Sequence, residues 1–502
     1  MHDPTRRDAI RTIAAGTTLA ASSALAACAS LRVLAESQPR TAPELPREFR
    51  SVWVATVDNI DWPSKPGLPA RTQRDEITRI IDTCARTGLN AILLQVRPTS
   101  DTLYSSRIEP WSAFLTGRQG RAPVPAYDPL EIWLDEAHKA GIDLHAWVNP
   151  FRVRHPKSIG PDAPNHIANT RPDLVRTHGP YLWMDPGEPD ARDYALRITD
   201  DLLTRYPVDG VHMDDYFYPY PQNDKPFPDA GTYRAHAGAH GRGLNIDDWR
   251  RGNINAFIKR TADLVRARRP GAILTVSPFG IWRPEHPPGV KGFDAYAGLY
   301  ADSRRWLREG SVDALMPQLY WPIESTGQPF EPLLDWWRSQ NPLGRHLWPG
   351  LYLTRIKPSG DPEKSWEPEQ IVRQIETIRT KPDANGFALF SAVGLLENRR
   401  GVTDDLRALN ASPAFVPISR WTETTPPRAP DAARDGSTLR LSAPGAGPAC
   451  RRFAITCSLG QETRCLSVAP TERRVALPAG TRDVWVAAVG SNGATSRAVF
   501  AR

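Results

Sequence analysis

The sequence predicts an α/β protein in which a (β/α)8 TIM barrel is followed by a small all-β, fibronectin-III-like sandwich. Three observations lead to this prediction. From residue 49 onwards, short apolar runs alternate eight times with stretches of helical periodicity, and polar residues gather at the ends of those runs. After Leu409 this alternation stops, and a segment rich in Pro, Thr and Arg leads into a stretch of short alternating strands.

The barrel prediction begins with its strands. We expect them at residues 49–56, 91–97, 143–150, 210–216, 273–280, 314–320, 347–353 and 386–392. Helical stripes such as Ile77, Ile80 and Ile81 lie between them, and Gly88 and Gly141 stand where helices should end. Parallel strands need such crossovers, and eight of them close a barrel. A doubly wound open sheet is the alternative, but no glycine-rich phosphate loop follows any of these strands.

The loss of the strand–helix alternation after Leu409 sets the domain boundaries. We assign residues 47–411 to the barrel, 412–436 to a linker and 437–502 to the β-sandwich domain. The last segment contains an alternating run at 484–489 followed by Ser491-Asn492-Gly493, which is typical of the final hairpin of a fibronectin-III-like sandwich.

The first residues predict export and lipid attachment. Residues 1–30 form an export signal in which Arg6-Arg7 precede a short apolar stretch, as in twin-arginine signals. Leu25-Ala26-Ala27-Cys28 matches a lipobox, in which Cys28 receives the lipid; the alternative is an ordinary signal peptide with an incidental cysteine. Residues 31–46 then act as a tether. We therefore expect a periplasmic protein held by its lipid anchor in the outer membrane.

Composition excludes one class of partner. The chain has 502 residues and a formal net charge of +7, from 63 basic and 56 acidic residues dispersed along it. Because no basic run stands out, we expect no nucleic-acid partner. The chain also has 16 Trp and 13 Tyr, which are suited both to packing against sugar rings and to filling a core.

The cysteines other than Cys28 fall into two groups. Cys84 occupies an apolar helix position and should be a buried thiol. Cys450, Cys457 and Cys465 lie close together in a chain that we expect to be exported, so one disulfide among them is expected. No histidine accompanies them, so they do not suggest a zinc site.

Polar residues at the ends of four expected strands predict a site at the barrel mouth. Strand by strand, they are Gln95 and Arg97; His145, Trp147 and Asn149; His212 and Asp214; and Gln318 and Tyr320. Their period-two spacing puts them on one face of each strand, where a purely structural strand would carry Val, Ile or Leu. Because barrel chemistry lies where strands end and loops begin, we expect these side chains to form a site.

Asp214 and Asp215 are the expected catalytic residues. They end a buried strand just before an aromatic loop, and glycoside hydrolysis needs a carboxylate and a proton donor around the sugar ring. Asp214 shares a face with His212, so we assign it the essential role, with Asp215 binding hydroxyls or tuning the pKa of Asp214. The alternative is that one Asp caps the loop while the other pairs with an arginine.

The second acid stays open from sequence alone. Glu324, Glu285, Asp61 and Asp101 all follow expected strands, and distance along the chain does not choose among them. Metal catalysis is a weaker alternative, because the strand-end histidines stand singly and lack a clear third ligand. No Gly-x-Ser-x-Gly elbow marks a serine nucleophile. We therefore expect neither a metal nor a cofactor.

With these motifs in place, the chain resembles the bacterial glycosyl-hydrolase-like family ten over about residues 47–410. The resemblance rests, in order, on 49–56, Asp61-Trp62-Pro63-Ser64, Gln95-Val96-Arg97-Pro98, Ala146-Trp147-Val148-Asn149-Pro150, 209–219, 277–282 and 316–321. It implies a (β/α)8 barrel that hydrolyses peptidoglycan glycan strands near the division septum. It further implies a preference for strands whose stem peptides an amidase has removed.

The resemblance also implies site residues. It places acids at Asp214 and Asp215, and groove residues at Asp61, Gln95, Arg97, Asn149, Tyr216, Trp282, Gln318, Tyr320 and Trp321. To the groove we add Asp101, His145, Arg152, His212 and Glu324 as substrate-binding candidates. Around Glu324 the chain departs from the glycine expected in relatives, which leaves the proton donor open.

The implied substrate gives some of these side chains a role. Arg97 and Arg152 would meet the lactyl carboxylates that peptide removal frees. The floor of an open groove would be formed by Trp62, Trp111, Trp147, Trp282 and Trp321.

The expected partners are the glycan polymer, the membrane through the lipid, and cell-division or amidase proteins. Two alternatives remain: a glycan-binding lipoprotein without turnover, which recruits partners through residues 437–502, and a hydrolase of a secreted exopolysaccharide.

Overall fold

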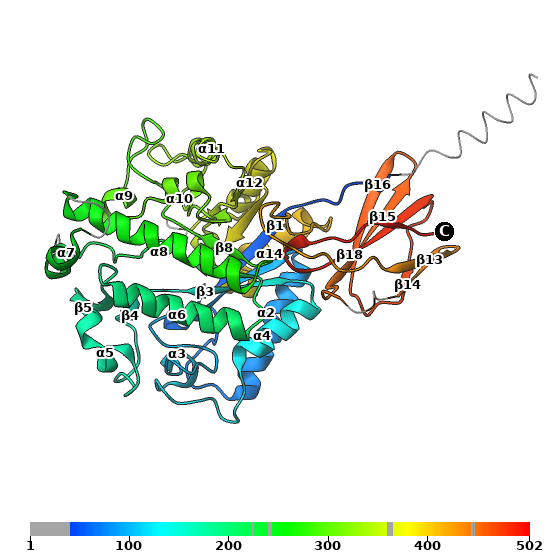
Figure 1. Cartoon of the computed structure of the whole chain (residues 1–502). Helices are drawn as coiled ribbons and strands as arrows, with labels where there is room; N and C mark the ends of the chain where they lie inside the picture. The colour runs from blue at the N-terminus through cyan, green and yellow to red at the C-terminus, as the bar shows by residue number, and fades with distance from the viewer. Residues whose placement is uncertain (1–40, 223–224, 239–242, 359–364, 443–444, 446) are drawn as a thin grey trace, which may run out of the picture. The chain divides into compact units, whose positions relative to one another are not determined.

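A nine-stranded parallel sheet forms the centre of the protein (Figure 1). The computed structural model describes residues 41–222, 225–238, 243–358, 365–442, 445 and 447–502, and the sheet count refers to these residues. In spatial order the strands are β10 (His346–Leu347), β9 (Ala314–Leu315), β8 (Ile273–Val276), β7 (Gly210–Met213), β3 (Asp143–Val148), β2 (Ala91–Arg97), β1 (Phe49–Val54), β12 (Gly386–Leu389) and β11 (Gly350–Leu351).

The two edge strands of this sheet are neighbours in the chain. Only Trp348 and Pro349 separate β10 from β11, yet β10 pairs with β9 and β11 pairs with β12. The Trp348 N–H donates to Leu315 O at 2.9 Å, and the Ala388 N–H donates to Pro349 O at 3.1 Å. The sheet therefore curls until its edges meet. With β10 and β11 taken as one interrupted strand, each predicted strand range overlaps one strand of a TIM-barrel-like sheet.

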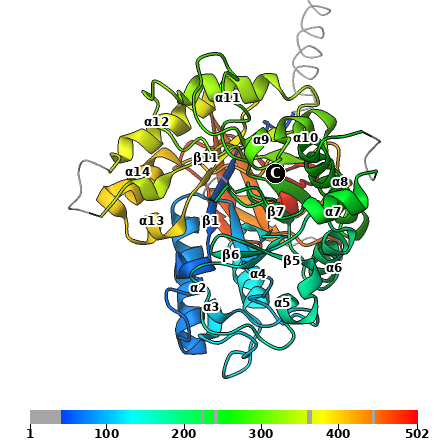
Figure 2. The same ribbon diagram turned by 90° about the vertical axis from the view of Figure 1, so that its left-hand side faces the viewer.

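Helices surround the strands, as Figure 2 shows. The helices that connect successive strands or follow the last one are α2 (Ala70–Arg86), α4 (Pro129–Lys139), α6 (Pro189–Arg205), α8 (Ile246–Arg268), α10 (Ser303–Glu309), α11 (Phe330–Ser339), α12 (Pro368–Arg379) and α14 (Val402–Leu409). Shorter helices lie in the loops: α3 (Ala113–Thr116), α5 (Ile167–Thr170), α7 (Ala230–His236), α9 (Ala295–Gly298) and α13 (Ala392–Leu396). The predicted stripe of α2 is confirmed, because Ile77, Ile80 and Ile81 are all buried.

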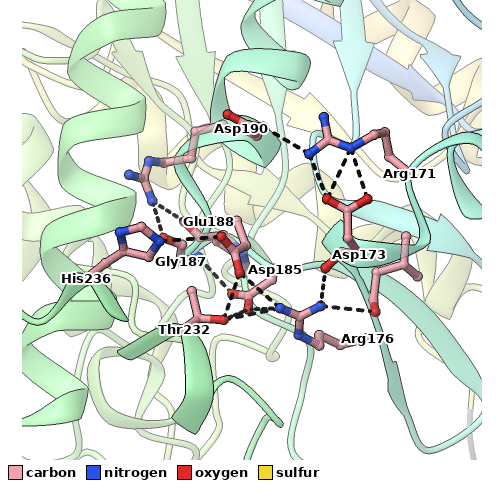
Figure 3. Close-up of polar contacts among 12 residues, drawn as sticks. Arg171, Asp173, Arg176, Asp185, Gly187, Glu188, Asp190, Thr232 and His236 are labelled. Atoms are coloured by element: carbon pink, nitrogen blue, oxygen red, sulfur yellow. Dashed lines mark hydrogen bonds and ion pairs between the residues drawn. The ribbon is translucent and has the colours of Figure 1, made fainter. Parts of the chain in front are cut away.

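An insertion that the sequence did not reveal lies between β3 and α6. It is a small antiparallel sheet in the order β4 (Arg152–Arg154), β6 (Tyr181–Met184) and β5 (Val175–His178). Figure 3 shows the ion-pair network beside it, where Arg176 lies 3.1 Å from both Asp185 and Glu188. Thr232 of α7 donates to Asp185 at 2.6 Å. The network thus connects the insertion to the end of the long loop that follows β7.

The C-terminal region is all-β, as predicted. One sheet has the order β13 (Asp431–Asp435), β14 (Thr438–Ser442), β17 (Arg474–Ala476). The other has the order β16 (Glu462–Val468), β15 (Arg452–Leu459), β18 (Asp483–Val489), β19 (Val499–Phe500). Strand β13 falls inside the predicted 412–436 linker, so that boundary is wrong and the β domain begins at Asp431. The physical reason is that β13 is half-exposed and carries few apolar residues, so its sequence lacks a strand signal.

Buried charges join the β domain to the barrel. Arg451 lies 2.7 Å from both Asp143, which begins β3, and Asp209, which precedes β7. The Asn492 N–H also donates to Asp143 at 2.8 Å, and its side-chain amide donates to Asp209 O at 2.8 Å. These contacts lie at the start of the strands, at the opposite end from the predicted site. Residues 44–502 accordingly form one compact unit.

The described cysteines are all free thiols, so the expected disulfide among Cys450, Cys457 and Cys465 is wrong. Thr456 of β15 pairs with Cys465 of β16, whereas Cys457 pairs with Arg464. Cys457 and Cys465 therefore point to opposite faces of their sheet. Cys84 is buried, as predicted. Cys28 and the predicted export signal lie outside the described residues, among which no helix is long and apolar enough to cross a membrane.

Candidate active site

A cleft of about 250 Å³ opens at the carboxyl ends of the barrel strands. It is lined by Trp53, Ala55, Val57, Ile60, Trp147, Arg152, His155, Asp214, Asp215, Tyr216, Ser277, Gln318, Tyr320 and Phe390. These residues come from the ends of β1, β3, β7, β8, β9 and β12 and from the loops that follow. The structure thus brings Asp214, Asp215, Arg152, Tyr216, Gln318 and Tyr320 together, as the sequence predicted.

Asp214 is held by a chain of side-chain amides. The Asn149 amide donates to the Asp214 carboxylate at 2.7 Å, and the Asn149 carbonyl oxygen accepts from Gln95 at 2.6 Å and from Arg152 at 2.9 Å. The carbonyl oxygen of Gln95 is fixed in turn by the backbone N–H groups of Thr56 and Val57, both at 2.9 Å. Because every amide has its orientation set by its partners, Asp214 always faces a hydrogen-bond donor.

Arg152 contributes charge to the site while remaining buried. Its guanidinium donates to the Tyr216 hydroxyl at 2.6 Å and to Pro98 O at 2.8 Å, in addition to Asn149. Burial raises the pKa of Asp214, and the positive charge of Arg152 with the hydrogen bonds from Asn149 and Tyr216 acts in the opposite direction. Arg152 therefore favours the ionised form of Asp214 and is already engaged by protein groups.

Asp215 faces the other side of the cleft. It accepts hydrogen bonds from the Tyr220 hydroxyl and, at 3.2 Å, from the Gln318 amide. Burial and the negative charge of Asp214 raise the pKa of Asp215 to about 7. Burial raises the pKa of both carboxyls, and the charge of Asp214 adds to this effect at Asp215, so Asp215 is the member of the pair that holds a proton up to near-neutral pH.

Tyr220 is a site residue that the sequence reasoning missed. It belongs to the aromatic loop after β7, in which the sequence predicts a role for Tyr216 but none for Tyr220. It lies five positions after Asp215, on an irregular segment where neither period two nor helical spacing indicates direction. The high density of tyrosines in this loop was the only feature of the sequence that could have indicated a role for Tyr220.

The two strand histidines lie below the cleft, inside the barrel. His212 accepts from Trp53 Nε1 at 2.9 Å through Nε2, so its proton is on Nδ1, which lies 2.8 Å from the Thr275 hydroxyl. Burial lowers the pKa of His212 well below its usual value and that of His145 to about 4. Both rings are therefore neutral and fully buried, a layer deeper than the predicted mouth.

Arg97 and Asp101 also lie away from the cleft. Arg97 is completely buried and forms a two-pronged ion pair with Glu109, at 2.7 and 2.6 Å. The pairing of β2 with β3 shifts register between Gln95 and Arg97, so these two residues do not share the simple alternation that predicted a common face. Asp101 is buried and accepts from Thr99 and Gln119. The expected groove position of Arg97 is therefore corrected.

The remaining candidates for a second acid form hydrogen bonds or ion pairs outside the cleft. Asp61 is buried and accepts from the N–H groups of Ala55 and Val393, both at 2.7 Å. Glu324 is exposed and pairs with Arg373. Glu285 is exposed and accepts from the Gly289 N–H. None of the three acids lines the cleft.

The predicted groove tryptophans divide into two groups. Trp147 lines the cleft, and half-buried Trp321 packs against Phe279, with ring centroids 5.6 Å apart. Trp282 instead stacks on Trp336 at 5.9 Å. Trp62 is fully buried and packs edge-on against a core tryptophan, so its expected place in the groove floor is corrected.

A side pocket of about 140 Å³ continues the cleft towards the insertion. It shares Arg152, His155 and Tyr216 with the cleft, and adds Tyr181, Trp183, Pro219, Tyr220 and Gln222. The rings follow one another closely: His155 and Tyr181 are 5.7 Å apart, and Tyr216 and Tyr220 are 6.0 Å apart. Such partly exposed aromatic faces are suited to packing against sugar rings.

Metal-ligating side chains do not cluster in the part of the chain described here. Among those residues, no group of three or more His, Cys, Asp or Glu side chains is placed to hold a metal ion.

The chain is similar in sequence to known proteins. The family model described as Glycosyl hydrolase-like 10 matches residues 48–368. Glycosyl hydrolase YngK of Bacillus subtilis is 38% identical over 396 residues, which are 76% of this chain and 76% of that protein. Glycosyl hydrolase DigH of Escherichia coli K12 is 34% identical over 381 residues, 70% of this chain and 84% of that protein. Among solved structures, the PgaB (BpsB) glycoside hydrolase domain from Bordetella bronchiseptica is 17% identical with a TM-score of 0.48, covering 72% of this chain and 99% of that one.

Proposed function

The chain belongs to the glycosyl hydrolase-like 10 family and is a glycoside hydrolase, and from this premise we propose that it cleaves peptidoglycan glycan strands whose stem peptides have been removed. The observation that carries the chemical part of this proposal is the pair of buried carboxylates at the cleft. Asp214 and Asp215 stand at the carboxyl end of β7, where barrel enzymes keep their reacting groups.

The environments of the two carboxylates give them different tasks. Asp215 is still partly protonated at neutral pH, because burial and the charge of Asp214 raise its pKa to about 7. It is therefore the proton donor to the oxygen of the departing sugar, a task that general acids perform best when their pKa lies near the working pH. Arg152 and Asn149 favour the ionised form of Asp214, which would stabilise the developing positive charge on the sugar ring.

The shape of the site supports a polymeric substrate. The cleft and the side pocket share three residues and form a continuous depression with aromatic faces in both parts. A single sugar ring needs only one such pocket, whereas a strand needs neighbouring ones. Recognition of free lactyl carboxylates rests less on Arg97 and Arg152 than the sequence suggested, because both guanidiniums are buried and bonded to protein groups.

The cellular setting remains part of the proposal. The lipobox at Leu25–Cys28 and the twin arginine at Arg6-Arg7 support export to the periplasm and lipid attachment at the outer membrane. Such an anchor would hold the enzyme beside the cell wall, where amidases and division proteins are the expected partners. Export and lipidation are tested by metabolic labelling with a fatty acid, which Cys28→Ser should abolish.

The proposed activity is tested on purified glycan. Protein lacking residues 1–30 is incubated with amidase-treated, peptide-free strands beside intact sacculi, and released fragments are identified by mass spectrometry. We expect fragments from the peptide-free strands only, and none with Asp214→Asn. The matched control is Asp82→Asn, an exposed aspartate of α2, which should behave like the wild type.

Other outcomes of this cleavage experiment would contradict the proposal. Equal cleavage of both substrates would refute the preference for peptide-free strands. Binding without cleavage would favour the glycan-binding alternative, and neither binding nor cleavage would direct the search to a secreted exopolysaccharide.

A further inference from the structure

The cleft has its acids on one wall. Of the residues that line it, all described, Asp214 and Asp215 alone are carboxylates, and they are consecutive in the chain. Consecutive Cα atoms are about 3.8 Å apart, so both side chains start from the same place on the wall. Asp214 turns towards β3, where it meets Asn149, and Asp215 turns towards β9, where it meets Gln318.

The opposite wall is aromatic. In the curled sheet, β7 faces the region of β1 and β12, which supplies Trp53 and Phe390 to the cleft, with Tyr320 beside them. Trp53 and Phe390 have ring centroids 6.1 Å apart, as do Tyr320 and Phe390. A hydrolase that uses two carboxylates places them around the scissile bond, one to donate a proton and one to attack the sugar or to activate water. Here the wall facing the proton donor offers no carboxylate among the lining residues.

This arrangement leaves the attack on the anomeric carbon without an enzyme carboxylate on the facing wall. Some glycoside hydrolases solve the same problem by using a group of the substrate. We propose that the attacking group is the carbonyl oxygen of the 2-acetamido substituent on the sugar whose glycosidic bond breaks. This inference rests on the proposed glycoside hydrolysis and deepens it, because it makes a 2-acetamido sugar at the reacting position obligatory.

The chemistry balances without any further reactant. The acetamido oxygen bonds to the anomeric carbon while the bond from that carbon to the departing sugar breaks, and Asp215 gives its proton to the departing oxygen. The product is a bicyclic oxazolinium ion. Water then attacks the anomeric carbon, Asp215 takes back a proton from that water, and the acetamide is restored. Two successive displacements at one carbon retain its configuration.

The cleft complements an acetamido group. The Asp214 carboxylate, fixed by Asn149 at 2.7 Å, accepts from the acetamido N–H and faces the positive charge that develops beside it. Trp53 and Trp147 provide an apolar surface for the methyl group. Tyr320 lines the same cleft, and its hydroxyl has no hydrogen bond to any described residue, so it is free to donate to the acetamido carbonyl.

A thiazoline analogue tests the proposal directly. In this compound a sulfur atom closes the same ring that the oxazolinium ion contains, so it imitates the intermediate. Isothermal titration calorimetry would compare the thiazolines of N-acetylglucosamine and N-acetylmuramic acid with the parent sugars. We expect at least one thiazoline to bind about 100-fold more tightly than its parent, the lower end for analogues of reaction transition states. Asp214→Asn should lose at least about tenfold of that affinity, and Asp82→Asn should lose none.

The outcomes separate this inference from the proposed substrate. Tight thiazoline binding with no cleavage of peptide-free strands would keep the acetamido mechanism and refute peptidoglycan as substrate. Cleavage of the strands with thiazolines bound no better than the parent sugars would refute the acetamido mechanism alone. The rival nucleophile would then be Asp58, an exposed residue after β1 whose charge acts on His155. A carboxylate mechanism would be established instead if Asp58→Asn lost turnover and one further result were found. That result is either an inverted configuration in the wild-type product or the capture of azide at the anomeric carbon by the variant.

Discussion

The hydrogen bond from Tyr220 to Asp215 makes an unusual prediction, namely that its removal improves activity in alkali. The Tyr220 hydroxyl stabilises the ionised form of Asp215 and so lowers the pKa of that carboxyl. As a proton donor, Asp215 works only while protonated, so activity should fall as the pH rises through about 7. Tyr220→Phe takes away the hydroxyl and keeps the ring, so the pKa of Asp215 should rise.

The magnitude follows from the kind of bond. A hydrogen bond to a charged group contributes about 1.5–3 kcal/mol, and one pKa unit corresponds to about 1.36 kcal/mol. The alkaline limb of the profile of kcat/KM against pH should therefore move upward by about one to two pH units. At pH 8 the protonated fraction of Asp215 would rise from about one tenth to more than half, so relative activity would increase roughly sixfold to tenfold.

The assay is the initial rate of fragment release between pH 5 and pH 10, with circular dichroism to confirm folding at each pH. Tyr206→Phe is the matched control, because Tyr206 donates to Asp128 at 2.7 Å outside the cleft. That variant should leave the profile unchanged. Gln318→Leu removes a neutral donor 3.2 Å from Asp215 and should give a smaller upward shift. An alkaline limb that stays in place or moves downward in an active, folded Tyr220→Phe variant would refute the role of Asp215 as proton donor.

Three further predictions follow from contacts described above. Asp215→Asn should lower kcat/KM on glycan strands by about 10²–10⁴-fold, but much less on aryl glycosides whose leaving groups need no proton; equal losses on both would contradict the assignment. Asn149→Ala takes the amide from Asp214 and the acceptor from Gln95 and Arg152, so it should lower kcat/KM by about ten- to a hundredfold and also lower Tm; wild-type kcat/KM in the folded variant would contradict the role of this amide. Arg451→Met leaves two carboxylates buried without their cation and should reduce the free energy of unfolding by about 3–5 kcal/mol in urea titrations; adding Asp209→Asn should restore part of it, and no recovery would show that charge is not the cause.

Much of the barrel was predictable because parallel strands are buried on both faces. Strands such as β2 and β3 are buried at every position, so they appear in the sequence as mainly apolar runs with few polar residues. The strands of the insertion lack this signal. Only one of the four positions of β5 is buried, so nothing in the sequence separates it from a loop. The break between β10 and β11 was equally hidden, because it depends on how the sheet closes around Pro349.

The site was predictable where regular backbone determined direction. Asn149 and Asp214 follow directly from two neighbouring strands, so period two and strand order brought them together. The same rule failed for Arg97, because the register shift after Gln95 breaks the alternation. Tyr220 lies on a loop, where direction depends on tertiary packing, as in its ring contact with Phe293 at 5.4 Å.

The ion pairs of Arg451 have a consequence for how this protein unfolds. The two acids that Arg451 neutralises belong to the barrel, while Arg451 itself immediately precedes β15 of the C-terminal domain. Melting of the β domain alone would remove the cation that Asp143 and Asp209 share, together with the hydrogen bonds from Asn492, and so would destabilise the barrel as well. The domains should therefore unfold together, in one calorimetric transition in place of two. The catalytic barrel of this glycosidase should therefore not be stable apart from the C-terminal domain, since the two share one cooperative folding unit.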